Sequence, residues 1–185
     1  MRRALDALYG TALWLSAICI MIIATLVGLQ VAARIYDAIM RLFGLPRGGF
    51  VILSLAEISG YLFAAASFLA LAGTLKSGAH IRVTMLVNAL PARVRTLVEG
   101  AALAFAAAAA AYGTWHVGSY AWQSLAFNAV SAGMLPVPLV YPQAAMAAGA
   151  AILTVAFLDE LVITIRTGRP SFSAHEDAVN LGREG

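Results

Sequence analysis

The chain has 185 residues, of which 62% are hydrophobic and only 11% are charged, whereas soluble domains carry roughly 25% charged residues. This composition excludes an ordinary soluble protein and predicts an all-α integral membrane protein. The net charge of +3 does not indicate nucleic-acid binding, because the basic residues lie in short clusters beside apolar spans. In that position they act as topology signals and contact lipid headgroups.

The N-terminal segment predicts a first transmembrane helix over residues 9–33, which contain no charged residue. About 20 apolar residues are enough to cross the hydrocarbon, and the run is longer than the roughly 7–15 apolar residues of a cleaved signal peptide. In residues 34–49 the apolar side chains fall at helical spacing on one face and the charged ones on another. This pattern predicts a helix lying in the plane of the membrane interface.

A second transmembrane helix is expected over residues 50–75, with Glu57 as its only acidic residue. An intramembrane carboxylate is a functional hypothesis by default. For Glu57, a structural or partner-contact role and a role in proton coupling both stay open. The same segment carries small residues at four-residue spacing, which would let helices approach closely, although alanine is abundant throughout the chain. These small residues are Gly60 with Ala64, and Ala66 with Ala70 and Thr74.

Three basic or imidazole side chains follow this second crossing: Lys76, His80 and Arg82. Short loops rich in Lys and Arg stay cytoplasmic, and an apolar stripe in residues 79–97 predicts a second in-plane helix there. His80 and Arg82 are candidates for contacts with lipid phosphates or with a partner's loops. Simple anchoring at the interface is the alternative interpretation for both.

Residues 100–158 contain no charged residue and are too long for one crossing, so they must contain a reversal. A glycine and three prolines in residues 128–142 place this turn. The flanking segments predict a third and a fourth crossing over residues 97–125 and 139–165. His116 is expected to be a hydrogen-bonded packing residue. The membrane domain thus comprises residues 1–165, and residues 166–185 form a cytoplasmic tail.

The distribution of basic residues predicts that both termini are cytoplasmic. Of the 12 basic residues, two lie in the N-terminal head, four in the second connection and three in the tail. The three in the first connection are left outside. Nine against three obeys the positive-inside rule, and the opposite orientation would violate it.

No nucleotide-binding glycine loop, Cys/His metal cluster or hydrolase motif appears in the sequence. A haem held between helices usually needs two axial ligands, and His80 and His175 both lie outside the expected crossings. We therefore expect neither enzymatic activity nor a cofactor.

Three features together resemble the small membrane subunit, of DctQ type, of tripartite ATP-independent periplasmic (TRAP) transporters. They are Glu57 early in the second crossing, the segment GTLKSGAHIRVTMLVNALP at residues 73–91, and MLPVPLVYPQAAMAAG at residues 134–149. The most specific part is the spacing of Gly73, His80, Ile81, Val83 and Pro91. Thr84 departs from the pattern, because members of the family often carry an acidic residue there.

The resemblance implies a non-catalytic scaffold in the bacterial inner membrane. Its partners would be a large multispanning subunit of elevator type, which carries the sodium and substrate sites, and a periplasmic binding protein that delivers an organic acid. Membrane lipids would be further partners. The alternative from another class is an autonomous small proton-coupled exporter of multidrug type that dimerises around Glu57. Uptake without this chain would contradict the first hypothesis, and transport by this chain alone would support the second.

Overall fold

The structure, a computed structural model, describes residues 2–46, 48–76 and 91–167. Its regular structure consists of four helices, α1 (Arg2–Leu42), α2 (Leu55–Lys76), α4 (Ala92–Ala126) and α5 (Val140–Thr167). Each is long and apolar enough to cross a membrane. The prediction of an all-α chain with four apolar helices is confirmed, whereas the second helix in the membrane plane and the location of the termini stay predictions.

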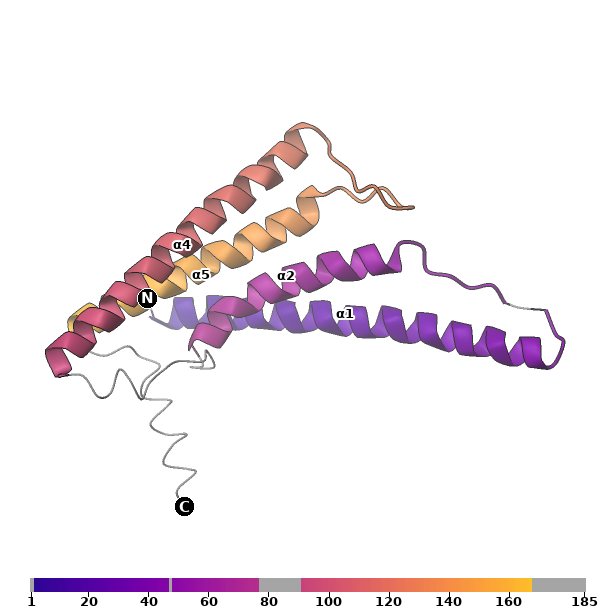
Figure 1. Cartoon of the computed structure of the whole chain (residues 1–185), viewed down its shortest axis with the longest axis horizontal. Coiled ribbons are helices and arrows are strands. Elements are labelled where there is room, and N and C mark those ends of the chain that lie inside the picture. The colour runs from indigo at the N-terminus through magenta and orange to yellow at the C-terminus, as the bar shows by residue number, and fades with distance from the viewer. Residues whose placement is uncertain (1, 47, 77–90, 168–185) are drawn as a thin grey trace, which may run out of the picture.

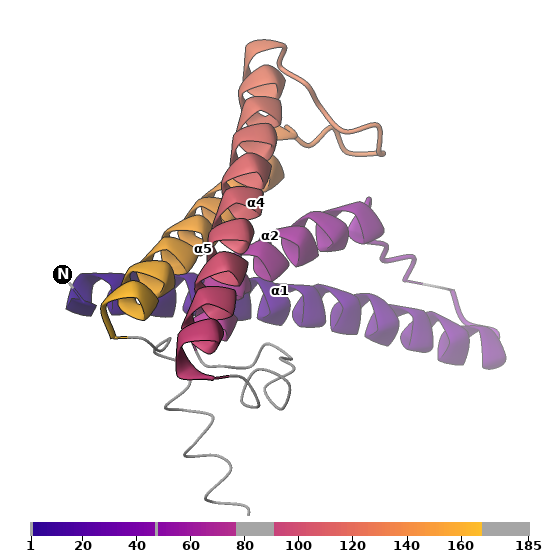
Figure 2. The same cartoon turned by 60° about the vertical axis from the view of Figure 1, so that its left-hand side comes forward.

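The four helices pack in a row. Helix α1 contacts α2, α2 contacts α5, and α5 contacts α4; α1 also touches α5 at a few positions, whereas α1 and α4 do not meet (Figures 1 and 2). Because no helix is surrounded by the others, most large apolar side chains remain exposed. The N-terminus, the end of α2, the start of α4 and the end of α5 lie at one end of the molecule. The connections α1–α2 and α4–α5 leave from the other end (Figure 1).

Helix α1 is longer than the sequence suggested. It has 41 residues, which at about 1.5 Å per residue is about 60 Å, or about twice the hydrocarbon thickness. The expected break after residue 33 is absent, so residues 34–42 continue α1 and do not form a separate helix. The reason is that no Gly or Pro occurs between Gly28 and Gly44, and charged residues on one face do not interrupt a helix.

A glycine ends α1. Gly44 adopts φ +66°, a left-handed conformation that is cheap only without a Cβ. The Leu45 N–H then donates to the Met40 carbonyl at 2.9 Å, which satisfies one of the carbonyls left free at a helix C-terminus.

The chain then returns along the last turns of α1. The Asp37 carboxylate accepts from the Gly48 N–H at 2.9 Å, and the Gln30 side-chain oxygen accepts from the Ile52 N–H at 2.7 Å. These bonds hold residues 48–54 in an irregular conformation. Helix α2 therefore starts at Leu55, later than the second crossing expected from residue 50.

Helices α2 and α5 approach most closely at Gly149. A Cβ on this residue would lie 2.5 Å from the Phe68 carbonyl carbon, so only glycine fits there. The small residues predicted to serve packing in α2 do so in part. Ala66 is buried, and its carbonyl accepts from the Ser16 hydroxyl at 2.8 Å, whereas Gly60 faces open space.

The reversal between α4 and α5 occupies residues 127–139 and starts one residue before the predicted stretch of residues 128–142. Two backbone bonds close it, from the Ser131 N–H to the Val137 carbonyl at 2.9 Å and from the Leu139 N–H to the Ala129 carbonyl at 3.0 Å. The second predicted in-plane helix falls mostly on residues 77–90, which lie outside the described residues, and its last positions belong to α4. The predicted tail lies outside them from residue 168.

Candidate functional site

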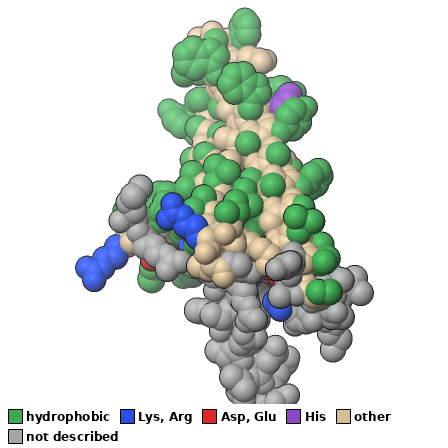
Figure 3. Space-filling view, turned by 90° about the vertical axis from the view of Figure 1, so that its left-hand side faces the viewer, with side chains coloured by type: hydrophobic (Ala, Val, Ile, Leu, Met, Phe, Trp, Pro, Cys, Tyr) green, Lys and Arg blue, Asp and Glu red, His purple; other side chains and the backbone are tan. Residues whose placement is uncertain are grey.

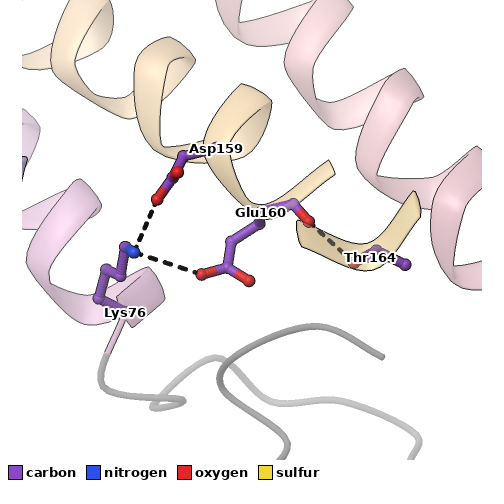
Figure 4. A network of polar contacts seen from close by, with 4 residues as sticks. All are labelled: Lys76, Asp159, Glu160 and Thr164. Carbon is purple, nitrogen blue, oxygen red and sulfur yellow. Dashed lines mark hydrogen bonds and ion pairs between the residues drawn. The ribbon is translucent and has the colours of Figure 1, made fainter. Parts of the chain in front are cut away.

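Three charged side chains join α2 to α5 at the end of the molecule where the N-terminus lies. The Lys76 ammonium lies 2.8 Å from the Asp159 carboxylate and 3.6 Å from that of Glu160 (Figure 4). Glu160 is fully buried, whereas the Lys76 and Asp159 side chains are about one-fifth exposed. We call these three residues the Lys76 cluster.

Neighbouring residues hold this cluster in place. The Lys76 ammonium lies 5.3 Å from the centre of the buried Tyr9 ring, a cation–π distance. The Thr164 hydroxyl donates to the Glu160 main-chain carbonyl at 2.8 Å. Tyr9 also packs with Ala72, Leu75 and Ala156 in the main apolar cluster. Helices α1, α2 and α5 therefore meet around one paired lysine.

Sequence reasoning treated Lys76 as a topology signal and gave no role to Asp159 and Glu160, which fall near the end of the fourth expected crossing. A signal for their pairing was available, because a cation at the end of one crossing and two carboxylates near the end of another lie at the same membrane level. The pattern could not show that α2 and α5 are neighbours. Only the packing brings residues 83 positions apart into contact.

Glu57 lies at the opposite end of the molecule from Lys76, in the first turn of α2. Its carboxylate accepts from the Tyr61 hydroxyl at 2.8 Å, one helical turn later. A Cβ at Gly133, in the α4–α5 connection, would overlap this carboxylate. The second carboxylate oxygen is buried without a hydrogen-bond partner among the described residues. The α4–α5 connection thus lies directly on Glu57.

A second bond ties this connection to α2. The Ser54 hydroxyl, just before α2, accepts from the Leu135 N–H at 3.1 Å. Ser54 itself adopts φ +55°, which is uncommon for a residue with a Cβ. We call Ser54, Glu57, Tyr61 and Gly133 the Glu57 cluster. It fastens the end of the α4–α5 hairpin to the start of α2.

The remaining predicted positions divide in two. His80 and Arg82 lie outside the described residues. His116 is exposed on α4 and its ring lies against Tyr112, with centroids 4.3 Å apart. Within residues 2–46, 48–76 and 91–167, no group of three or more His, Cys, Asp or Glu side chains is placed to hold a metal ion.

An open groove of about 790 Å³ runs between α4 and α5. Thr114 and Thr154 line it, and their hydroxyls are 3.1 Å apart and also donate to carbonyls in their own helices. Trp115 and Trp122 line it as well. The walls are almost wholly apolar, as expected for a surface that faces lipid or another helix.

The family model for the DctQ component of tripartite ATP-independent periplasmic transporters matches residues 35–167, which make up most of the 185 residues. The chain belongs to this family. The match includes every residue of both clusters and confirms the family resemblance found in the sequence. A search of curated proteins gave no match.

Membership in the DctQ family makes the chain a component of a TRAP transporter, the small permease subunit. The four apolar helices agree with a multi-pass membrane protein. Both clusters consist of contacts within the small subunit, and these contacts stabilise its own fold.

Proposed function

We propose that this small TRAP subunit is a stationary, non-catalytic scaffold for the large membrane subunit, in a complex that imports an organic acid. Sodium drives the uptake in this proposal, and a periplasmic binding protein delivers the substrate. The complex lies in the bacterial inner membrane with both termini of this chain in the cytoplasm. The sites for sodium and substrate belong to the large subunit.

The observation that carries the proposal is the single row of helices. A row presents two broad apolar faces and two edge helices: α4 packs on α5, and α1 packs on α2 with a small contact to α5. Lipid offers no hydrophobic drive for helices to associate, so a row must be held by close packing and hydrogen bonds. Gly149 and the two clusters provide these between α2, α5 and the α4–α5 connection. A firmly joined, broad element suits a support against which another subunit moves.

The charges support the same proposal. The carboxylates of Asp159 and Glu160 face the Lys76 ammonium, and the Glu57 carboxylate accepts a hydrogen bond from Tyr61. The first group joins α2 to α5 and the second lies within α2, so the two are not aligned along one path through the described chain. For the same reason we propose a structural role for Glu57, and contacts with lipid phosphates or partner loops for His80 and Arg82.

The alternative of an autonomous exporter that dimerises around Glu57 is not supported. The Glu57 carboxylate contacts Gly133 and Tyr61 of its own chain. A dimer built around Glu57 would first have to displace the α4–α5 connection.

Reconstitution tests the proposal. The chain is co-expressed with the large membrane subunit from a neighbouring gene and purified in mild detergent. The complex enters liposomes with the binding protein added outside, and a labelled dicarboxylate, sialic acid and keto acid serve as probes. We expect sodium-dependent uptake of one probe by the complex and none by the chain alone. Full-rate uptake by the large subunit and binding protein without this chain would overturn the scaffold.

A further inference from the structure

The start of α2 carries the sequence pattern of a capping box. Ser54 directly precedes the helix and its carbonyl accepts the first helical bond, from the Ile58 N–H at 3.0 Å; Glu57 is the third helical residue. In a capping box the Ser hydroxyl accepts from the main-chain N–H of the Glu, and the Glu carboxylate accepts from the main-chain N–H of the Ser. Leu53 and Ile58 also stand at the two positions whose apolar side chains pack together beside such a box. The pattern therefore predicts that Ser54 and Glu57 bond to each other.

In the structure both side chains bond elsewhere. The Ser54 hydroxyl accepts from the Leu135 N–H at 3.1 Å, and the Glu57 carboxylate accepts from the Tyr61 hydroxyl at 2.8 Å. The same carboxylate lies against Gly133. Within the described residues, neither side chain accepts a bond from an N–H in the first turn of α2. The two residues of the capping box thus hold the α4–α5 connection in place of their own helix end.

This arrangement carries two local costs. Ser54 adopts φ +55°, which is unfavourable for a residue with a Cβ, whereas an N-cap residue ordinarily has an extended backbone. The second Glu57 carboxylate oxygen is buried without a hydrogen-bond partner among the described residues, which is unfavourable because that oxygen has lost its water. A capping box would remove both costs, since Ser54 would become extended and its N–H would donate to the Glu57 carboxylate.

The α4–α5 connection keeps its shape without α2. The Ser131 N–H donates to the Val137 carbonyl at 2.9 Å, and the Leu139 N–H donates to the Ala129 carbonyl at 3.0 Å. The Ser131 hydroxyl also donates to the Leu135 carbonyl at 3.1 Å. Because these bonds lie within the connection, it can move away from α2 as one piece.

No charge pair holds the connection on α2. Residues 127–139 contain no charged residue, and no Lys, Arg, Asp or Glu side chain is visible toward the end of α4, at the top of Figure 3. The connection is held by the hydrogen bond from Leu135 to Ser54 and by the contact of Gly133 with Glu57. A hydrogen bond between neutral groups contributes little in a membrane protein, so the local costs at Ser54 and Glu57 offset much of it.

We propose that Ser54 and Glu57 form a two-state switch. In the clasped state, which is the state of the structure, they hold the α4–α5 connection; in the released state they close the capping box, and the connection moves off α2. The inference goes beyond the scaffold function, because it concerns a movement within this chain. The helices stay joined in both states, since Gly149 and the Lys76 cluster lie outside the switch. A partner that contacts the connection in only one state would shift the balance.

Two substitutions at adjacent positions should move the switch in opposite directions. Ser54→Gly favours the clasped state, because glycine adopts the left-handed backbone readily. The hydroxyl that it removes accepts one bond in each state, so this loss affects both. Leu55→Pro favours the released state, because proline fits the first helical position and keeps the preceding residue, Ser54, extended.

Electron–electron resonance distances in the co-purified complex measure the two states. Nitroxides replace Met134 in the connection and Ala32 on α1, both exposed, after Cys19, the only cysteine, is changed to Ala. We expect Ser54→Gly to keep the distance of the structure and Leu55→Pro to raise the share of a second distance about fivefold, the cost of one left-handed residue. The control pair, Ala32 with Ala109 on α4, should not change.

Hydrogen exchange identifies the released state. Leu55→Pro should slow exchange of the Glu57 main-chain amide about fivefold and speed that of the Leu135 amide equally, and adding Ser54→Ala should abolish the slowing at Glu57. If Leu55→Pro does not assemble, Gly133→Val gives the same test, because its Cβ would overlap the Glu57 carboxylate only in the clasped state.

Three outcomes would overturn the switch and leave the scaffold function standing. One is a single distance that neither variant alters. Another is a changed distance in the control pair, which would mean that helices and not the connection move. The third is release of the connection without slower exchange at Glu57, which would show that no capping box forms.

Discussion

The carboxylates at the two ends of the molecule, near Lys76 and near Glu57, have different partners. At one end Glu160 and Asp159 face the Lys76 ammonium between α2 and α5, and Glu160 is fully buried. At the other end Glu57 meets the neutral Tyr61 hydroxyl and the backbone at Gly133. A buried ion pair is costly to break from one side, whereas a hydrogen bond between helical neighbours contributes little. The Lys76 cluster therefore joins helices, and the Glu57 cluster positions a connection.

The strongest test of this difference is Lys76→Met. Removing the ammonium leaves the carboxylates of Asp159 and Glu160 without their cation, so we expect the free energy of unfolding to fall by about 3–5 kcal/mol. Denaturation of the purified subunit in mixed detergent micelles measures it. Lys76→Arg keeps the charge and should recover most of the stability. Equal stability of the Met and Arg variants would show that the ion pair does not join the helices.

The second test lies between the two ends, where α2 and α5 touch. Gly149→Ala would place a Cβ 2.5 Å from the Phe68 carbonyl carbon, and overpacking of this kind costs about 1–3 kcal/mol. Gly60→Ala is the matched control, because it meets open space and removes the helix penalty of glycine, worth about 0.5–1 kcal/mol. Thermal unfolding of both variants in detergent should move in opposite directions. A harmless Gly149→Ala would mean that the α2–α5 contact is not held as closely as described.

The third test separates the α4–α5 connection from the helices. Gly133→Ala pushes a methyl group onto the Glu57 carboxylate, which can swing aside, so the expected cost is only about 1 kcal/mol. Glu57→Ala removes the obstacle, and the same glycine substitution should then cost almost nothing. A double-mutant cycle of unfolding free energies measures the coupling. Additive effects would place the connection away from Glu57.

The smallest expected effect belongs to Tyr61→Phe, which removes one hydrogen bond to Glu57. Such bonds in membrane proteins average about 0.6 kcal/mol, well below the effect of Lys76→Met. Tyr112→Phe is the control, because the Tyr112 hydroxyl is exposed and makes no hydrogen bond with the described residues. A loss as large as that of Lys76→Met would remove the distinction between the two ends.

Much of the fold follows from local patterns. Apolar runs of bilayer length determine the four helices, and the prolines of the 128–142 stretch determine the reversal, because both signals depend only on neighbouring residues. The break expected near residue 33 was wrong because charged residues at helical spacing mark a face and do not end a helix. Gly44 ends α1 through its left-handed backbone.

The sequence by itself determined the membrane class, the number of apolar helices and the family, since these depend on composition, length and motif spacing. Only the tertiary structure decided which helices are neighbours, and hence that Lys76 meets Asp159 and Glu160 and that Gly133 covers Glu57. The physical reason is that lipid solvates every apolar helix face equally well. Which faces meet is decided by close backbone approach and a few polar contacts, and the contacts of α2 with α5 and with the α4–α5 connection link residues more than 70 positions apart.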